Sequence, residues 1–133
     1  MTSVVLDASA ALAYLTDEKG AAQVEGYLKA GSCMSAANWA EVISKISDLG
    51  MNYQELEKIF RQRGLIEQAI KFFPLTLEDA KTIGGLRSIT KKFGLSLADR
   101  ACLALAIRLN LPAVTADSSW LKLKHAIRVI SIR

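Results

Sequence analysis

The stretch Val4-Val5-Leu6-Asp7-Ala8-Ser9-Ala10 sets a strand-to-helix pattern that recurs along the chain. The apolar run from Thr2 to Leu6 is rich in β-branched residues and predicts a short buried strand that ends at Asp7. Residues 8–16 then predict a helix. A strand that passes directly into a helix is the start of a βαβ unit, so this opening indicates a parallel sheet.

The same pattern continues through the rest of the sequence. Helices are expected over 20–30, 36–49, 53–62, 76–92 and 96–110, with a helical turn at 118–123. Further strands are expected at 33–34, 66–73, 113–115 and 127–130. Strands separated by helices predict an α/β fold: one domain over residues 1–133, with a central parallel sheet of four or five short strands flanked by helices on both faces.

Composition narrows the class of protein. The 133 residues are 51% hydrophobic and 23% charged, which fits one domain with a buried core and excludes a disordered chain. No apolar run approaches the roughly 20 residues that span a bilayer, and the start lacks the features of a signal peptide. A cytoplasmic protein without membrane association is expected. Cys33 and Cys102 lie in apolar stretches outside any CxxC pair, so both are expected to be free and buried.

Four acidic residues occupy related places in this pattern. Asp7 and Asp117 each follow a predicted strand, and Glu41 and Asp99 each lie early in a predicted helix. Ligands of open parallel sheets bind outside the carboxyl ends of the strands, and right-handed crossovers would bring all four acids to that edge. Each acid also has a structural interpretation. Asp7 and Asp117 fit N-caps, Asp99 fits a capping box, and Glu41 fits an ion pair with Lys45.

Convergence of the acids would call for a cation, because carboxylates that lie close together repel one another. Oxygen ligands without His or Cys favour Mg²⁺ or Mn²⁺ over zinc. The single histidine excludes a nuclease that uses two histidines as acid and base. An acidic pocket on a chain of net charge +4 suits a polyanionic substrate, since basic residues attract its phosphates.

Four segments in a fixed order carry a family pattern over essentially the whole chain: Val5–Ala10, Ser35–Val42, Gly94–Ala106, and Thr115–Asp117 followed by Trp120. Together they resemble the PIN-domain ribonucleases, and within them the VapC-type toxins of toxin–antitoxin modules. Some family members carry a further acid shortly after the position of Asp117, where this chain has Ser118 and Ser119. This departure favours one metal ion over two.

The resemblance implies a catalytic quartet that holds Mg²⁺ or Mn²⁺ and hydrolyses RNA phosphodiester bonds: Asp7, Glu41, Asp99 and Asp117. It implies polar partners beside this quartet: Ser9, Asn38 and Thr115. Arg100 is a candidate for substrate binding, with a structural ion pair as its alternative.

The resemblance also implies that a cognate antitoxin protein inhibits the endoribonuclease, and that the toxin forms a homodimer. The antitoxin is expected in an apolar trough around helices 36–49 and 53–63: Trp39, Met51, Tyr53, Leu56 and Phe60. Core packing is the alternative interpretation of these side chains. A catalytically weak PIN-like module that binds metal, antitoxin or nucleic acid remains the alternative function, and a DNA-cleaving enzyme is a third. A haloacid-dehalogenase-like phosphatase would need a second Asp at the position of Ser9.

Overall fold

The five short strands form one sheet that is parallel throughout. The structure is a computed structural model and describes residues 3–65, 69–123 and 127–133. The strands are β1 Val5–Leu6, β2 Ser32–Ser35, β3 Ile70–Phe73, β4 Ala113–Thr115 and β5 Val129–Ser131. Their order in the sheet is β3-β2-β1-β4-β5. The first strand is therefore central, with β2 on one side and β4 on the other. The predicted α/β fold with a parallel sheet is confirmed.

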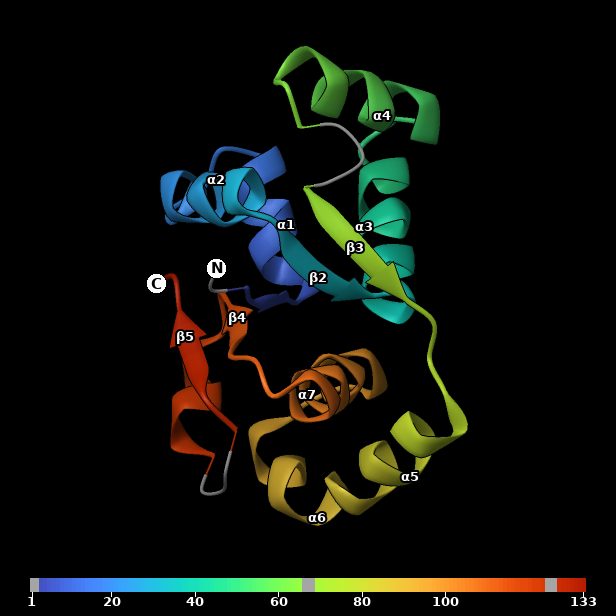
Figure 1. Cartoon of the computed structure of the whole chain (residues 1–133), viewed down its shortest axis with the longest axis vertical. Coiled ribbons are helices and arrows are strands. Elements are labelled where there is room, and N and C mark those ends of the chain that lie inside the picture. The colour runs from blue at the N-terminus through green and yellow to red at the C-terminus, as the bar shows by residue number, and fades with distance from the viewer. Residues whose placement is uncertain (1–2, 66–68, 124–126) are drawn as a thin grey trace.

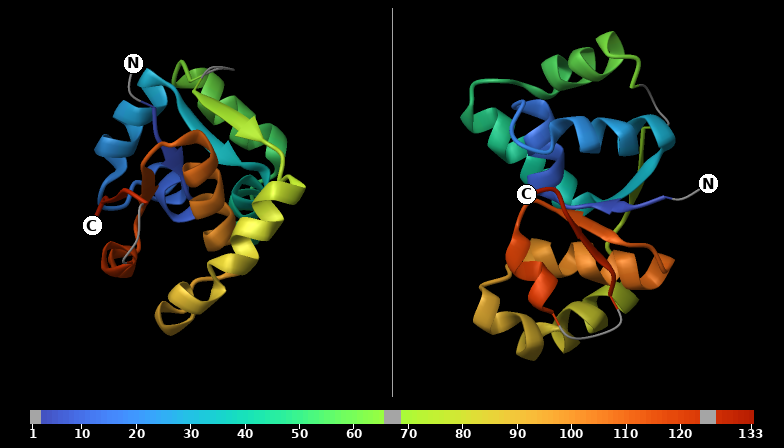
Figure 2. Two further views of the ribbon diagram at one scale, coloured as in Figure 1. Left: turned by 60° about the horizontal axis from the view of Figure 1, so that its bottom comes forward. Right: turned by 90° about the vertical axis from the view of Figure 1, so that its left-hand side faces the viewer.

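Helices cover both faces of this sheet (Figure 1). On one face lie α1 Ala8–Leu15, α2 Ala21–Ala30, α3 Ala36–Asp48 and α4 Tyr53–Gln62. On the other face lie α5 Leu77–Gly85, α6 Arg87–Thr90, the 3-10 helix η1 Lys91–Phe93, α7 Leu97–Leu109 and the 3-10 helix η2 Ser118–Lys122. Figure 2 shows the strands lying between these two layers.

Strand side chains alternate between two hydrophobic clusters, as the pleat of a sheet requires. Leu6, Met34 and Val114 pack with α1, α2 and α3. Their neighbours Val5 and Cys33 point the other way and pack with α7. Cys33 and Cys102 are both buried and free, as predicted. Among the described residues, no helix is long and apolar enough to cross a bilayer.

The prediction of a single helix over 76–92 is wrong. The segment is divided into α5, α6 and η1. The first break follows Gly84-Gly85, where two glycines lower helix propensity. The second follows Thr90, whose Oγ1 donates a 2.8 Å hydrogen bond to the carbonyl of Leu86 within a buried turn. These breaks let the chain curve around α7. Residues 66–68 of the predicted strand 66–73 lie outside the described residues.

Candidate active site

Asp7 lies where the central strand passes into the first helix. It follows Leu6 at the carboxyl end of β1 and is only 2% exposed. Its Oδ1 accepts a 2.8 Å hydrogen bond from the N–H of Ala10, so Asp7 is the N-cap of α1. The structural interpretation of this residue is therefore confirmed. The cap also fixes the direction of the carboxylate at the sheet edge, where ligands of parallel sheets bind.

Two hydroxyl groups hold the other side of this carboxylate. Thr115 donates from Oγ1 to Oδ2 of Asp7 at 2.6 Å, and Ser9 Oγ lies 2.8 and 2.9 Å from the two carboxylate oxygens. Each hydroxyl oxygen also accepts a backbone N–H, Ser9 from Ala116 at 2.9 Å and Thr115 from Asp117 at 3.0 Å. The two hydroxyls therefore join Asp7 to the segment that carries Asp117.

Burial makes Asp7 a weaker acid than an exposed aspartate. Desolvation raises its pKa from 3.8 to about 6, although hydrogen bonds from Thr115, Ala10 and Ser9 oppose the shift. The negative charge of Asp99 adds to the raised pKa. A buried carboxylate that is costly to ionise gains most from a bound cation, because the cation replaces the lost hydration.

Asp99 lies in the first turn of α7 and faces the same region. It forms a capping box with Ser96: the side chain of Ser96 accepts the N–H of Asp99, and Asp99 Oδ2 accepts the N–H of Ser96 at 2.9 Å. The charge of Asp99 contributes to the raised pKa values of Asp7 and Glu41, which lie on other elements, and of Cys102 in the same helix. Asp99 therefore lies close enough to act electrostatically on two of the predicted acids.

Glu41 and Asn38 come from α3, three residues apart and so on one helix face. Asn38 is fully buried and its Nδ2 donates a 3.0 Å hydrogen bond to the carbonyl of Ala98, which ties α3 to the start of α7. Partial burial and the charge of Asp99 raise the pKa of Glu41, while Lys45 lowers it. Within the described part of the chain, the buried atoms Glu41 Oε2 and Asn38 Oδ1 have no hydrogen-bond partner.

Asp117 is the member of the quartet whose carboxylate binds within its own 3-10 helix. It is exposed, and its Oδ1 accepts hydrogen bonds from the N–H and the hydroxyl of Ser119, at 3.0 and 2.7 Å. It is thereby the N-cap of η2. Its backbone is nevertheless bound to Thr115, which contacts Asp7. The backbone places Asp117 at the site edge, and its side chain caps its own helix.

The four acids do not form a closed metal cage in this structure. Over residues 3–65, 69–123 and 127–133, no group of three or more Asp, Glu, His or Cys side chains is placed to hold one metal ion. The local chemistry still fits a hard cation. The donors are all oxygens, the pKa of Asp7 is raised, and two buried acceptor atoms are unpaired. Mg²⁺ keeps several waters, so a few carboxylates suffice to hold it.

Arg100 points away from solvent. It is 9% exposed, and its Nη1 donates a 3.0 Å hydrogen bond to the carbonyl of Ile83 near the end of α5. Its Nε is buried without a partner among the described residues. Burial and this contact favour a role in packing α7 against α5, while a substrate contact by Arg100 stays a prediction.

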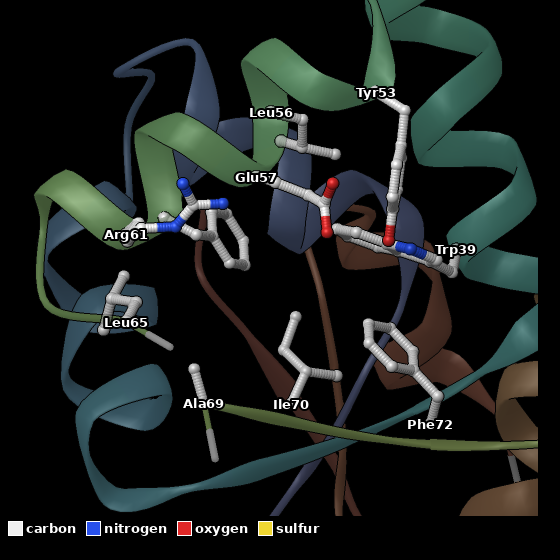
Figure 3. Close-up of a pocket in the computed structure, with 10 residues that line it drawn as sticks. Trp39, Tyr53, Leu56, Glu57, Arg61, Leu65, Ala69, Ile70 and Phe72 are labelled. Atoms are coloured by element: carbon white, nitrogen blue, oxygen red, sulfur yellow. The ribbon is translucent and has the colours of Figure 1, made fainter. Parts of the chain in front are cut away.

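A separate pocket of about 250 Å³ lies between α4 and the edge strand β3. Side chains from these two elements face each other across it, with Trp39 of α3 at one end (Figure 3). The Trp39 ring centroid lies 4.9 Å from that of Phe72 and 6.0 Å from that of Phe60. Four of the five side chains expected to form an apolar trough do line the pocket: Trp39, Tyr53, Leu56 and Phe60.

The fifth, Met51, is not a lining residue, and the sequence missed most of the opposite wall. That wall includes Ala69, Ile70 and Phe72. The sequence predicted a strand at these residues but not its place in the sheet. Only the strand order shows that β3 is an edge strand and can form a wall of the pocket. The charged side chains Glu57 and Arg61 also line the pocket and were not foreseen.

Solved structures with the same fold include several complexes. One is a toxin–antitoxin complex from Klebsiella pneumoniae, with 18% identity, a TM-score of 0.68 and 98% of each chain covered. Another is DNA-bound VapBC from Salmonella typhimurium, with 14% identity, a TM-score of 0.69 and complete coverage of both chains. FitAcB from Neisseria gonorrhoeae has 18% identity, a TM-score of 0.69 and 97% of each chain covered.

At these identities the solved structures show a shared fold and nothing more. No curated protein matches the sequence. The sequence itself matches the PIN domain over residues 4–126, which is nearly its full length. The order of the strands, the acid after the central strand and this match lead to one conclusion: the chain belongs to the PIN domain family.

Proposed function

We propose that this protein is a metal-dependent endoribonuclease of the toxin type, which hydrolyses RNA phosphodiester bonds and is inhibited by a cognate antitoxin. The observation that carries the proposal is the buried Asp7 at the end of the central strand, under the electrostatic influence of Asp99 on another element. The charge of Asp99 also raises the pKa of Glu41, which lies on a third element. PIN domains are typically nucleases, and several structures of this fold are toxin–antitoxin complexes.

Asp7, Glu41, Asp99 and Asp117 are the residues that would hold Mg²⁺ or Mn²⁺. When bound, the cation supplies charge that stabilises the phosphate and acidifies water. The hydrogen bonds from Ser9 and Thr115 keep the Asp7 carboxylate in one orientation. The unpaired Oε2 of Glu41 is suited to accept a hydrogen bond from the water that attacks phosphorus.

Asn38 has a positioning role in this proposal. Its hydrogen bond to Ala98 fixes the distance between α3, which carries Glu41, and the turn of α7 that carries Asp99. The geometry of the two acids then depends on one buried amide. A fixed arrangement of charged groups lowers the barrier because no reorganisation is needed during the reaction.

Cleavage of total RNA tests the proposal. The purified protein is incubated with RNA in Mg²⁺, in Mn²⁺ and in EDTA, and the cut ends are mapped. A DNA flap substrate is assayed in parallel. Asp7→Asn and Asp99→Asn should abolish the cuts and relieve growth arrest, whereas Glu78→Gln, which removes an exposed carboxylate on α5, should leave both unchanged.

Cuts that persist in EDTA, or in the Asp7 variant, would contradict a metal-dependent reaction. The alternative function is a module that binds metal, antitoxin or nucleic acid without cutting. Asp7→Asn separates the two, since a pure binding module would keep its effect on growth.

The pocket between α4 and β3 is the site that we assign to the antitoxin. Its walls are largely apolar, and Tyr53 and Phe72 are 38% and 43% exposed. Aromatic side chains that surround a concave site are typical anchors of protein interfaces. Tyr53→Ala should weaken antitoxin binding by about tenfold or more. Leu77→Ala, an exposed apolar residue outside the pocket, is the matched control. Homodimer formation stays a prediction, measurable by sedimentation.

A further inference from the structure

The charges of this protein are divided along the sequence far more unevenly than its net charge of +4 suggests. Residues 1–79 contain 7 Lys or Arg and 11 Asp or Glu, a net charge of −4. Residues 80–133 contain 10 Lys or Arg and 2 acids, a net charge of +8. Those two acids are Asp99 and Asp117, both part of the proposed site.

The fold converts this division along the chain into a division in space. Residues 80–133 include most of α5 and all of α6, α7 and η2, the layer on one face of the sheet. Helices α1 to α4 of the other layer come from the acidic part of the chain. The proposed active site lies at the sheet edge where the two layers meet, so a polyanion meets attraction from one layer and repulsion from the other.

Several cations of the basic layer are already engaged. Arg108 pairs with Asp79, Arg133 pairs with Glu18, and Arg100 is buried. Six others are exposed and take part in no ion pair among the described residues: Lys81, Arg87, Lys91, Lys92, Lys122 and Arg128. Four of these, Arg87, Lys91, Lys92 and Lys122, lie on α6, η1 and η2. We call these four side chains the basic face.

The basic face is close along the chain to two of the proposed site residues, Asp99 and Asp117. Lys91 and Lys92 lie on η1, only a short connection before the Ser96–Asp99 capping box. Lys122 ends η2, the helix that Asp117 caps. The segments α6–η1 and η2 belong to the same layer of the fold (Figures 1 and 2). Their flanking side chains share one hydrophobic cluster, which includes Leu86, Phe93 and Trp120.

We propose that the basic face binds the phosphate backbone of single-stranded RNA and leads it to the carboxylates of Asp7 and Asp99. This inference rests on the proposed ribonuclease function and names the surface that holds the substrate. Exposed lysines on long side chains contact phosphates without fixed base contacts, so this surface supplies affinity that depends little on sequence. The acidic layer across the site then fixes the side from which the strand enters.

Binding and cleavage are measured separately to test this surface. The triple variant Lys91→Gln/Lys92→Gln/Lys122→Gln is compared with the wild type and with Lys19→Gln/Lys58→Gln, which removes exposed lysines from the acidic layer. The probe is a fluorescein-labelled single-stranded RNA of about 20 nucleotides, titrated in EDTA so that binding is read without cleavage. A duplex DNA of the same sequence is titrated alongside. The salt dependence of binding is measured for each protein.

The triple variant should bind the RNA at least about tenfold more weakly. Its log–log salt slope should fall by about 2, since each phosphate contact on a single strand contributes about 0.7. In Mg²⁺ its cleavage defect should appear mainly in KM. The Lys19/Lys58 variant should match the wild type in both assays.

Equal losses in the two variants would overturn the proposal, because net charge alone would then account for binding. Unchanged RNA affinity in the triple variant would overturn it too, while cleavage by the wild type would leave the ribonuclease function standing. A wild type that cuts no RNA but still binds it through these lysines would refute the function and retain the surface.

Discussion

Thr115 donates a 2.6 Å hydrogen bond to Asp7, a residue 108 positions earlier in the chain. The bond joins neighbouring strands, because β4 pairs with β1 through Leu6 and Val114. It is one of the interactions that lower the pKa of the buried carboxylate against the desolvation that raises it. A methyl-for-hydroxyl change at this position isolates the contribution of that bond.

Thr115→Val should therefore weaken both stability and activity. It removes one of the two hydroxyl donors to Asp7 Oδ2 and the acceptor for the N–H of Asp117; a polar group that loses its partner costs about 1–3 kcal/mol. The pKa of Asp7 should rise further, which weakens Mg²⁺ binding at neutral pH. Urea unfolding with and without Mg²⁺ measures both effects. Thr115→Ser retains the hydroxyl and should stay near wild type; equal loss in both variants would mean that the methyl group matters instead.

Asp7 should destabilise the metal-free protein at neutral pH. Its pKa is about 6 in the folded protein and ordinarily 3.8, so the folded state binds the proton more tightly than the unfolded state does. The contribution of Asp7 to the free energy of unfolding in EDTA should therefore be most favourable below about pH 4. It should fall by about 2–3 kcal/mol in total as the pH rises through about 6. Asp7→Asn should remove this component and be more stable than wild type at about pH 7.5.

Urea unfolding of the two proteins across this pH range checks the sign. The difference should shrink toward acidic pH, where Asp7 of the wild type is protonated. Mg²⁺ should stabilise the wild type and leave the Asn variant unchanged. A wild type that Mg²⁺ does not stabilise would remove Asp7 from the set of metal ligands.

Asn38→Asp should be severely destabilising. The side chain is fully buried, and the substitution replaces its donor to the Ala98 carbonyl with a carboxylate close to Glu41. An unpaired buried charge facing a carbonyl costs about 3–5 kcal/mol. Asn52→Asp is the matched control, because Asn52 is the exposed N-cap of α4 and Asp caps a helix equally well. Thermal unfolding of both variants measures the contrast, and similar melting temperatures would refute the bridging role of Asn38.

The ion pair between Asp79 and Arg108 should stabilise the protein except in acid. Burial acts to raise the pKa of Asp79, but hydrogen bonds from Arg108 and Thr76 and the charge of Arg108 outweigh it, so the pKa lies below 3.8. The stabilisation is then present above about pH 4 and lost as the pH falls through the lowered value. Asp79→Asn should cost about 1–3 kcal/mol at neutral pH and progressively less below pH 4. Glu78→Gln, next to it but exposed, should show no such trend.

The sequence predicted the parallel sheet because β1, β2 and β4 are short apolar runs, each followed by a change to helical spacing. It failed on the segment after β3. Periodicity continues through 76–92, but Gly84-Gly85 and the buried Thr90 divide that helix. Periodic patterns report which side chains face the core, and they do not report whether the backbone between them stays in one straight helix.

For the candidate site, the catalytic and structural interpretations of the acids are compatible rather than competing. Asp7, Asp99 and Asp117 each cap a helix, and two of them also act on one another electrostatically. What the sequence did not provide is side-chain direction. Asp117 follows β4 as expected, but its carboxylate binds Ser119, a choice made by local hydrogen bonds that position in the chain does not fix. The hydrogen bond from Asn38 to Ala98 could not be predicted either, because it joins two helices that are far apart in the sequence.

The dependence of Asp7 on Thr115 has a consequence for synthesis. The strand that supplies Thr115 is made 108 positions after Asp7, and β1 cannot pair with it until that part of the chain has left the ribosome. Every shorter nascent chain lacks both this donor and the segment after it. Under the proposed function, the site therefore forms only after β4 has been made, and any product truncated before Thr115 lacks this support for Asp7.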